Sequence, residues 1–323
     1  MRNNDEILVL FENYLAQIAM PKEPQLLYEP IIYSMSGGGK RIRPTLLMLT
    51  CEAFGGDAAD ALGAAAAVEM FHNFTLLHDD IMDNAMVRRS RPSVFAKWGS
   101  NVAILSGDVM MIEAYRHLQG VEAKYLPAVF ERFNTMAAQV CEGQQYDMDF
   151  ETQPKVAVAE YMNMIELKTA ALLCGAVTIG ATLAGASEED VQKLHRFATE
   201  VGLAFQLQDD LLDSYGDEQL GKKIGGDILE GKKTYLMIIS LSHATEPQRE
   251  VLRSTHLNKE LSDEEKIAAV KGVYDAIGAK QMTEQQISVR ISRALAILDT
   301  LSVPAERLEY MKSYVESLVG RKK

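Results

Sequence analysis

The segment FTLLHDDIMD, Phe74 to Asp83, places three carboxylates inside an apolar run. A second segment, FQLQDDLLD at Phe205 to Asp213, repeats the arrangement. Residues four apart lie about 40° apart on a helix, so Asp79 and Asp83 would share one face. Like charges at that spacing destabilise a helix, and carboxylates among apolar side chains are costly unless paired or metal-bound. Two such clusters therefore predict sites for a hard cation.

Carboxylate oxygens suit Mg²⁺, which keeps several waters and commonly shares its shell with substrate phosphates. A solvated acidic face is the alternative for either cluster alone, and the repetition argues against it. Basic residues near both clusters favour a phosphate ligand, because guanidinium and backbone donors hold phosphate well. These are Lys40, Arg41 and Arg43 in the loop GGGKRIRP, Arg88 and Arg89 after the first cluster, and the lysines of LGKKIGGD and EGKKTY after the second.

Helical patterns dominate the chain. Hydrophobic residues make up 47% of its 323 residues and charged residues 24%, which is typical of a soluble globular protein. Alternating β-branched runs are scarce, and no linker or repeat divides the chain. We therefore predict an all-α fold in one domain, 1–323. Helices are expected at 4–20, 57–84, 101–119, 126–149, 158–185, 187–215, 233–243, 246–255, 263–278, 281–301 and 304–319.

Three local signals mark helix starts. Asp57 is a suitable N-cap for the helix that carries the first cluster. Ser187 with Asp190 resembles a capping box, and Pro44 suits a first helical turn.

The net charge of −12 argues against a nucleic-acid partner, which usually requires a basic face. The uncharged run 169–187 is rich in Ala, Gly and Thr without an aromatic belt, so we expect a buried core helix there. The three cysteines are dispersed, which is typical of thiols in a reducing compartment. With an N-terminus that lacks a signal-peptide pattern, these features predict a cytoplasmic protein with no stable membrane insertion.

Glu69 and His72 form a Glu-x-x-His pattern of the kind found in di-iron carboxylate bundles. Such centres use two of these pairs, and the sequence holds no second one. A di-iron protein is therefore disfavoured.

The motifs GGKRIRP, HDDIMD with Arg88-Arg89, Lys168-Thr169, FQLQDDLLD, GKKIGGD and GKKTY occur in the order and at the spacings of a known family. Over nearly its whole length the chain resembles the trans-isoprenyl diphosphate synthases, or polyprenyl synthetases. The resemblance implies an all-α isoprenoid synthase-type bundle around a central cavity, and a homodimer. It also implies a reaction, in which an allylic diphosphate ionises, isopentenyl diphosphate attacks the cation, and proton loss leaves a longer chain.

The resemblance also assigns roles by motif. Magnesium ligands would be Asp79, Asp83 and Asp209, supported by Asp80 and Asp213, with about three Mg²⁺ ions per site and Mn²⁺ as an alternative. The allylic diphosphate would contact Arg88, Lys168, Lys223 and Lys232. Isopentenyl diphosphate would contact Lys40, Arg43, His72 and Arg89. Oxygens of Thr169 and Gln206 would lie near the cation, and Arg321-Lys322-Lys323 resembles a basic tail that closes over the isopentenyl site in some members.

Chain length is expected to depend on residues before the first cluster. Phe74 occupies the position where many short-chain members carry an aromatic residue, with Thr75 beside it and Met70 and Phe71 a turn deeper. An ideal helix puts Thr75 about 40° and Phe74 about 140° from Asp79, so the assignment of Phe74 rests on the resemblance. We predict a C15 or C20 product with C20 preferred, and plain core packing is the alternative role for Phe74.

The first cluster has two residues between its acidic pair and its last aspartate, where many bacterial farnesyl enzymes have four. A medium- or long-chain synthase therefore stays open as an alternative. Other classes are a terpene cyclase, a non-catalytic subunit of a heteromeric prenyl synthase and a helical metal-binding protein without catalysis. The second aspartate cluster and the basic loop argue against the cyclase, and retention of both sets of residues argues against the subunit.

Overall fold

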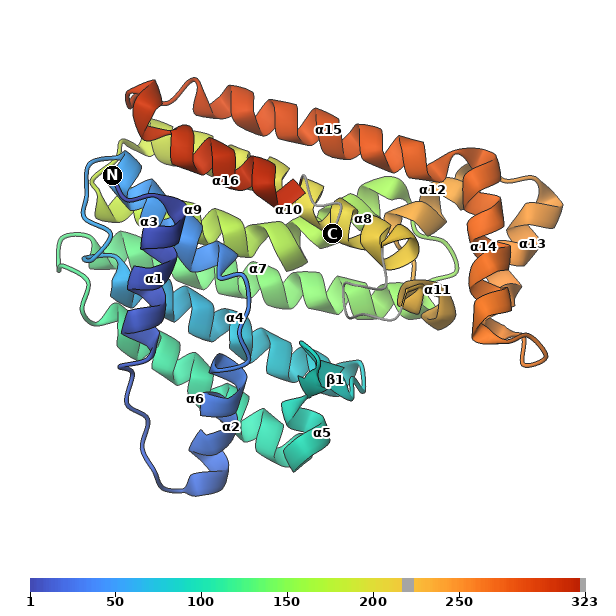
Figure 1. Cartoon of the computed structure of the whole chain (residues 1–323), viewed down its shortest axis with the longest axis horizontal. Coiled ribbons are helices and arrows are strands. Elements are labelled where there is room, and N and C mark those ends of the chain that lie inside the picture. Colours follow the sequence, from blue (N-terminus) through green and yellow to red (C-terminus); the bar gives the residue numbers. More distant parts are fainter. Residues whose placement is uncertain (217–223, 320–323) are drawn as a thin grey trace. The chain divides into compact units, whose positions relative to one another are not determined.

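The computed structural model describes residues 1–216 and 224–319, and within these ranges the regular secondary structure is helical apart from one short hairpin (Figure 1). The prediction of an all-α fold is confirmed. The α-helices are α1 (Asn4–Leu15), α2 (Gln25–Met35), α3 (Ile42–Ala53), α4 (Leu62–Met82), α5 (Val94–Trp98), α6 (Ser100–Leu118), α7 (Leu126–Thr152), α8 (Val158–Ile165), α9 (Ala171–Leu183), α10 (Glu188–Tyr215), α11 (Gly226–Glu230), α12 (Tyr235–His243), α13 (Glu246–Ser254), α14 (Asp263–Ile277), α15 (Ala279–Leu298) and α16 (Glu309–Val319).

Shorter elements complete the described chain. A π-helical turn, η1 (Glu166–Ala170), joins α8 to α9, and 3-10 turns η3 (Thr255–Leu257) and η4 (Ala305–Arg307) follow later. The described residues cluster into two compact units. Unit 1 contains 1–137, 172–195 and 298–314, and unit 2 contains the described residues within 138–171, 196–297 and 315–323. The single domain over 1–323, the central cavity and the homodimer stay predictions.

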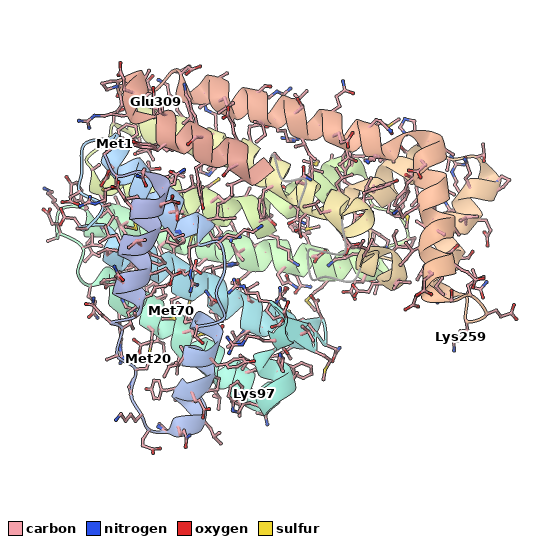
Figure 2. The ribbon with its side chains drawn as sticks, in the orientation of Figure 1. Met1, Met20, Met70, Lys97, Lys259 and Glu309 are labelled. Carbon is pink, nitrogen blue, oxygen red and sulfur yellow. The ribbon has the colours of Figure 1, made fainter. Side chains whose placement is uncertain are left out.

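Unit 1 is organised around α4. This helix runs along α6 and also contacts α1, α2, α3 and α5 (Figure 1). Its first turns contain the buried alanines 64–67, whose small side chains allow neighbouring helices to approach. Met70, labelled in Figure 2, is 1% exposed, and the adjacent Phe71 is fully buried. The resulting apolar packing fixes the helix that ends in the first aspartate cluster.

A two-stranded hairpin follows α4. Strand β1 (Val87–Arg88) pairs antiparallel with β2 (Arg91–Pro92), and Arg88 lies opposite Arg91. The two turn residues have positive φ, 52° at Arg89 and 59° at Ser90. Two-residue turns of this kind favour Asn and Gly, so the local sequence gives no hairpin signal. The hairpin nevertheless brings Arg88 back toward the end of α4.

Unit 2 has its own apolar core. Residues from α8, α10, α12 and α14 supply most of it, and α14 also contacts α11 and α13. Tyr161, Leu207, Leu236 and Tyr274 are buried members. Gly143 allows α7 to approach the π-helical turn η1 closely, because a Cβ at this position would lie 2.2 Å from the backbone nitrogen of Lys168.

Most expected helices are confirmed, with corrected ends. Helix α2 was not predicted, and the first helix ends at Leu15 rather than near residue 20. Asp57 is not an N-cap: it accepts a hydrogen bond from the Ala59 amide within a turn, and α4 begins at Leu62. Ser187 does cap α10, because its Oγ accepts a hydrogen bond from the Asp190 amide. Pro44 lies in the first turn of α3.

One stretch among the described residues, Val158–Leu183, is long and apolar enough to cross a membrane. In its most apolar window, 83% of the residues are buried inside the protein. A core helix gives this signal as readily as a membrane span does. The burial therefore agrees with the expected core helix.

Candidate active site

The first aspartate cluster divides into a buried member and two accessible ones. Asp80 is 2% exposed, and its Oδ1 accepts hydrogen bonds from Nε and Nη2 of Arg88 at 2.8 and 2.5 Å. Burial raises the pKa of Asp80, and the Arg88 hydrogen bonds oppose that rise. The Asp79 side chain is 20% exposed, with Oδ2 3.5 Å from Arg88 Nη2, and Asp83 is exposed. Asp80 therefore anchors Arg88, while Asp79 and Asp83 remain accessible.

The second cluster has the same division. Asp210 is 4% exposed and accepts hydrogen bonds from the Tyr161 hydroxyl, from Gln206 Nε2 at 3.0 Å and from the Tyr235 amide at 3.3 Å. Burial raises the pKa of Asp210 to about 6, against the lowering effect of these donors. Asp209 is exposed and Asp213 is half-buried. Again the middle carboxylate is structural and the outer carboxylates are accessible.

The accessible carboxylates of the two clusters are suitable ligands for a Mg²⁺ ion that also binds substrate phosphate. Among the described residues, no group of three His, Cys, Asp or Glu side chains converges closely enough to hold an ion alone. Mg²⁺ does not need such a cage, because it is commonly held by one or two carboxylates together with water and phosphate oxygens. The accessible carboxylates of each cluster have that chemistry.

Asp227 joins the second cluster, and sequence reasoning did not single it out. Its backbone amide donates to Asp213 Oδ2 at 3.1 Å. Burial raises its pKa to about 7, the Asp213 carboxylate adds to the rise, and Lys232 opposes it. The available signal was the segment IGGD, which starts α11 beside the second cluster.

The predicted pair Lys168-Thr169 lies in the π-helical turn η1. Lys168 Nζ is 2.6 Å from Asp147 Oδ2, and Thr169 Oγ1 donates to Gln206 Oε1 at 2.8 Å. Gln206 in turn donates to Asp210, so one chain of hydrogen bonds orients the Thr169 and Gln206 oxygens. Asp147 and Gly143 were missed from the sequence; a glycine inside a long helix four residues before an aspartate was the only signal.

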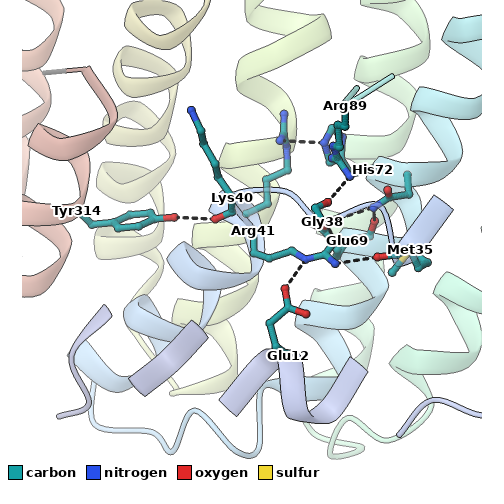
Figure 3. Close-up of polar contacts among 11 residues, drawn as sticks. Glu12, Met35, Gly38, Lys40, Arg41, Glu69, His72, Arg89 and Tyr314 are labelled. Atoms are coloured by element: carbon teal, nitrogen blue, oxygen red, sulfur yellow. Dashed lines mark hydrogen bonds and ion pairs between the residues drawn. The ribbon is translucent and has the colours of Figure 1, made fainter. Parts of the chain in front are cut away.

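The basic loop gathers most of the residues expected at isopentenyl diphosphate (Figure 3). Arg43 Nη1 lies 3.1 Å from His72 Nε2, and Arg89 Nη1 donates to the Gly38 carbonyl. Burial lowers the pKa of Arg43 to about 10, which leaves it charged at neutral pH. Burial and the neighbouring arginines hold the pKa of His72 well below its usual range, so His72 is neutral and accepts from Arg43. Lys40 is exposed, and its carbonyl accepts from the Tyr314 hydroxyl at 3.4 Å.

A pocket in unit 1 adds a further arginine. It encloses about 370 Å³ of empty space, its open mouth included. Arg91, which sequence reasoning missed, stacks its guanidinium over the Tyr33 ring at 4.0 Å. Three guanidinium groups beside one pocket suit an anion. The lining residues include Arg88, Arg89, Arg91, Asn73, Asp80 and Leu76.

The residues expected to set chain length lie along α4. Met70 and Phe71 are buried, while Phe74 and Thr75 are half-buried. The Phe74 ring is 5.6 Å from the Phe71 ring and 4.7 Å from the His78 ring. Phe74 thus belongs to an aromatic row, and its role in chain length stays a prediction.

The remaining predicted residues are placed as follows. Lys223 and Arg321-Lys322-Lys323 lie outside the described residues. Lys232 is half-buried beside Asp227. Glu69 and His72 contact Arg41 and Arg43, so each member of the Glu-x-x-His pair faces a guanidinium group.

Known proteins resemble this chain in sequence and in fold. The sequence profile described as Polyprenyl synthetase matches residues 24–275. A short chain isoprenyl diphosphate synthase from Methanothermobacter thermautotrophicus is 38% identical over 291 residues, 90% of this chain and 86% of that protein. The crystal structure of a geranylgeranyl pyrophosphate synthase is 39% identical, with a TM-score of 0.95 over 100% of both chains.

A second solved structure was determined with ligands. It is a geranylgeranyl pyrophosphate synthase from Corynebacterium glutamicum complexed with isoprenyl diphosphate and magnesium. It is 28% identical, with a TM-score of 0.85 over 99% of this chain and 97% of that one. From the profile match, the relatives and the fold, the chain belongs to the polyprenyl synthetase family.

Proposed function

We propose that this prenyltransferase condenses isopentenyl diphosphate with C5 to C15 allylic diphosphates and releases geranylgeranyl or farnesyl diphosphate and pyrophosphate. The observation that carries the proposal is the repeated cluster, in which Asp80 and Asp210 are buried and held while Asp79, Asp83 and Asp209 stay accessible. A merely solvated acidic face would not bury its middle carboxylate twice. The geranylgeranyl synthases among the relatives favour C20 over C15.

Mg²⁺, when bound, neutralises charge that develops on the departing pyrophosphate. Asp79, Asp83 and Asp209 would hold the ions, with Asp80 and Asp213 in support. About three ions per site and use of Mn²⁺ are part of the proposal. Arg88, Lys168, Lys223 and Lys232 would hold the allylic diphosphate.

The chain's own residues prepare the reaction in two ways. Lys40, Arg43, His72 and Arg89 hold the diphosphate of isopentenyl diphosphate. The hydrogen bond that Thr169 gives to Gln206 leaves lone pairs on Thr169 Oγ1 that can face a cation. We assign no protein general base, because the released pyrophosphate can accept the proton lost from the new chain.

The proposal includes a homodimer in the cytoplasm. Exposed apolar residues on α6, Ile104, Leu105 and Ile112, suit a second copy, and light scattering would reveal a monomer if that is wrong. The three free thiols suit a reducing compartment, and the burial of Val158–Leu183 suits a core helix rather than a membrane span.

A product assay tests the proposed activity. Purified protein receives Mg²⁺, labelled isopentenyl diphosphate and one C5, C10 or C15 primer, and mass spectrometry reads the products. We expect C15 or C20 products from shorter primers. Products of C30 or longer would identify a long-chain synthase. Absence of any elongation, with primer consumed to a hydrocarbon or left intact, would contradict the proposal.

Phe74→Ala should lengthen the product by one or more C5 units. The substitution removes a ring that contacts Phe71 and His78, and so opens space along α4. Mass spectrometry of the product mixture measures the change, and Phe74→Leu, which keeps most of the volume, should shift it less. An unchanged distribution would assign Phe74 to core packing alone.

A further inference from the structure

Arg41 lies between two proposed ligands, Lys40 and Arg43, but it cannot bind substrate itself. Its side chain is 3% exposed, and each of its three nitrogens already donates a hydrogen bond within the protein. Nε donates to Glu12 Oε1 at 2.8 Å, Nη1 to Glu69 Oε1 at 2.7 Å and Nη2 to the Met35 carbonyl at 2.8 Å (Figure 3). The planar guanidinium thus joins α1, α2 and α4 at one point.

The backbone at Arg41 is also unusual. Its φ and ψ of 45° and 40° are left-handed, a conformation that a side chain other than Gly, Asn or Asp seldom adopts. Such a conformation persists only where surrounding contacts enforce it. The three hydrogen bonds of the buried guanidinium are the contacts that hold it. The bend they hold sets the direction in which Lys40 and Arg43 leave the loop.

Two parallel contacts fix the loop against α4. Arg41 pairs with Glu69, and Arg43 lies 3.1 Å from His72, one helical turn later. A step of two residues, from the N-cap of α3 into its first turn, therefore matches a step of three residues along α4. Asn73 supports the first contact, since its Nδ2 donates to the Glu69 carbonyl at 2.8 Å. Loss of the Arg41–Glu69 contact would remove one of these two contacts with α4 and leave the Arg43–His72 contact less well supported.

We infer that Arg41, through its contact with Glu69, is a positioning residue that aligns Lys40, Arg43 and His72 for the diphosphate of isopentenyl diphosphate. The inference rests on the proposed function for the identity of that ligand. Arg41 itself touches no substrate, and its effect is confined to one of the two substrates. The other basic residue groups considered for the allylic diphosphate, around Lys168 and Lys232, lie in unit 2.

The test is a comparison of Michaelis constants for the two substrates in Arg41→Gln and Glu69→Gln. In each, KM for isopentenyl diphosphate should rise at least about tenfold, equivalent to about 1.4 kcal/mol. KM for the allylic diphosphate should change less than about twofold. Arg41→Lys keeps the positive charge but lacks the planar guanidinium with its several donors. Its KM for isopentenyl diphosphate should lie between the values for wild type and Arg41→Gln. The double variant should resemble either single variant, because both remove one contact.

Arg290→Gln is the matched control, because Arg290 forms a half-buried ion pair with Glu200 at 2.9 Å in unit 2. It should leave both KM values unchanged. Circular dichroism confirms that each variant is folded at the assay temperature. Equal rises in both KM values, additive effects in the double variant, or an unchanged KM for isopentenyl diphosphate in folded Arg41→Gln would overturn the inference.

Failure of the proposed function has a different signature, namely no elongation by the wild type. In that case calorimetry with inorganic pyrophosphate, in the presence of EDTA, replaces the kinetics. Wild type and Arg290→Gln should bind it alike, and Arg41→Gln at least about tenfold more weakly. Equal binding by all three would overturn the inference independently of any activity.

Discussion

Asp79→Ala should lower kcat by about a thousandfold or more, equivalent to about 4 kcal/mol of transition-state stabilisation. The substitution removes a proposed Mg²⁺ ligand from α4, and with it the charge neutralisation that the bound ion would supply to the departing pyrophosphate. The fold should survive, because Asp79 is partly exposed and Asp80 keeps its hydrogen bonds to Arg88. Steady-state turnover at saturating Mg²⁺ and substrate measures the effect.

The thermal midpoint of the metal-free variant should stay close to that of the wild type, because relief of the Asp79–Asp83 repulsion offsets loss of the Asp79 contact with Arg88. Asp60→Ala, an exposed aspartate before α4, is the control and should keep wild-type turnover. Turnover within a few-fold of wild type in Asp79→Ala would remove the first cluster from the mechanism.

Gly143→Ala should have the second large effect. Its Cβ would lie 2.2 Å from the nitrogen and 2.6 Å from the Cα of Lys168, and backbone atoms cannot move aside cheaply. Overpacking of this kind costs about 1–3 kcal/mol of folding free energy. The π-helical turn that carries Lys168 and Thr169 would have to shift, and displacements of about 1 Å at a catalytic group can cost a hundredfold in rate.

Denaturant unfolding and steady-state kinetics measure both consequences. Gly272→Ala in α14 is the matched control, because nothing lies within 4 Å of its added Cβ. That control should gain about 0.5–1 kcal/mol, as alanine does over glycine in a helix, with unchanged turnover. If Gly143→Ala had the same effect on stability and turnover as Gly272→Ala, the close approach of α7 to η1 would not matter for activity.

Features encoded within one helical turn were predictable from the sequence. The spacing of Asp79 and Asp83, the capping contact of Ser187 with Asp190 and the apolar pattern of α10 depend on residues a few positions apart. For the same reason the division of each cluster was only partly visible. A pattern shows which carboxylates share a face, but not that Asp80 would meet Arg88 across a hairpin.

Features set by distant contacts were not predictable. Helix α2 contains Pro30, which lowers local helix propensity, and its packing against α4 and α6 outweighs that cost. The turn at Arg89-Ser90 adopts positive φ with residues that do not favour it. Asp147 meets Lys168 across 21 positions of sequence, and Tyr161 meets Asp210 across 49. Such pairs are defined by the fold rather than by any local signal.

The most direct test of the central claim is calorimetric titration with an allylic S-thiolodiphosphate, an analogue whose carbon–sulfur bond resists ionisation. The claim is that the accessible aspartates hold Mg²⁺ and that Mg²⁺ holds the diphosphate. Wild-type protein should bind the analogue at least about a hundredfold more tightly with Mg²⁺ than with EDTA, a difference of about 2.7 kcal/mol. Asp79→Ala should lose most of that gain. Equal affinity in Mg²⁺ and in EDTA would contradict the claim.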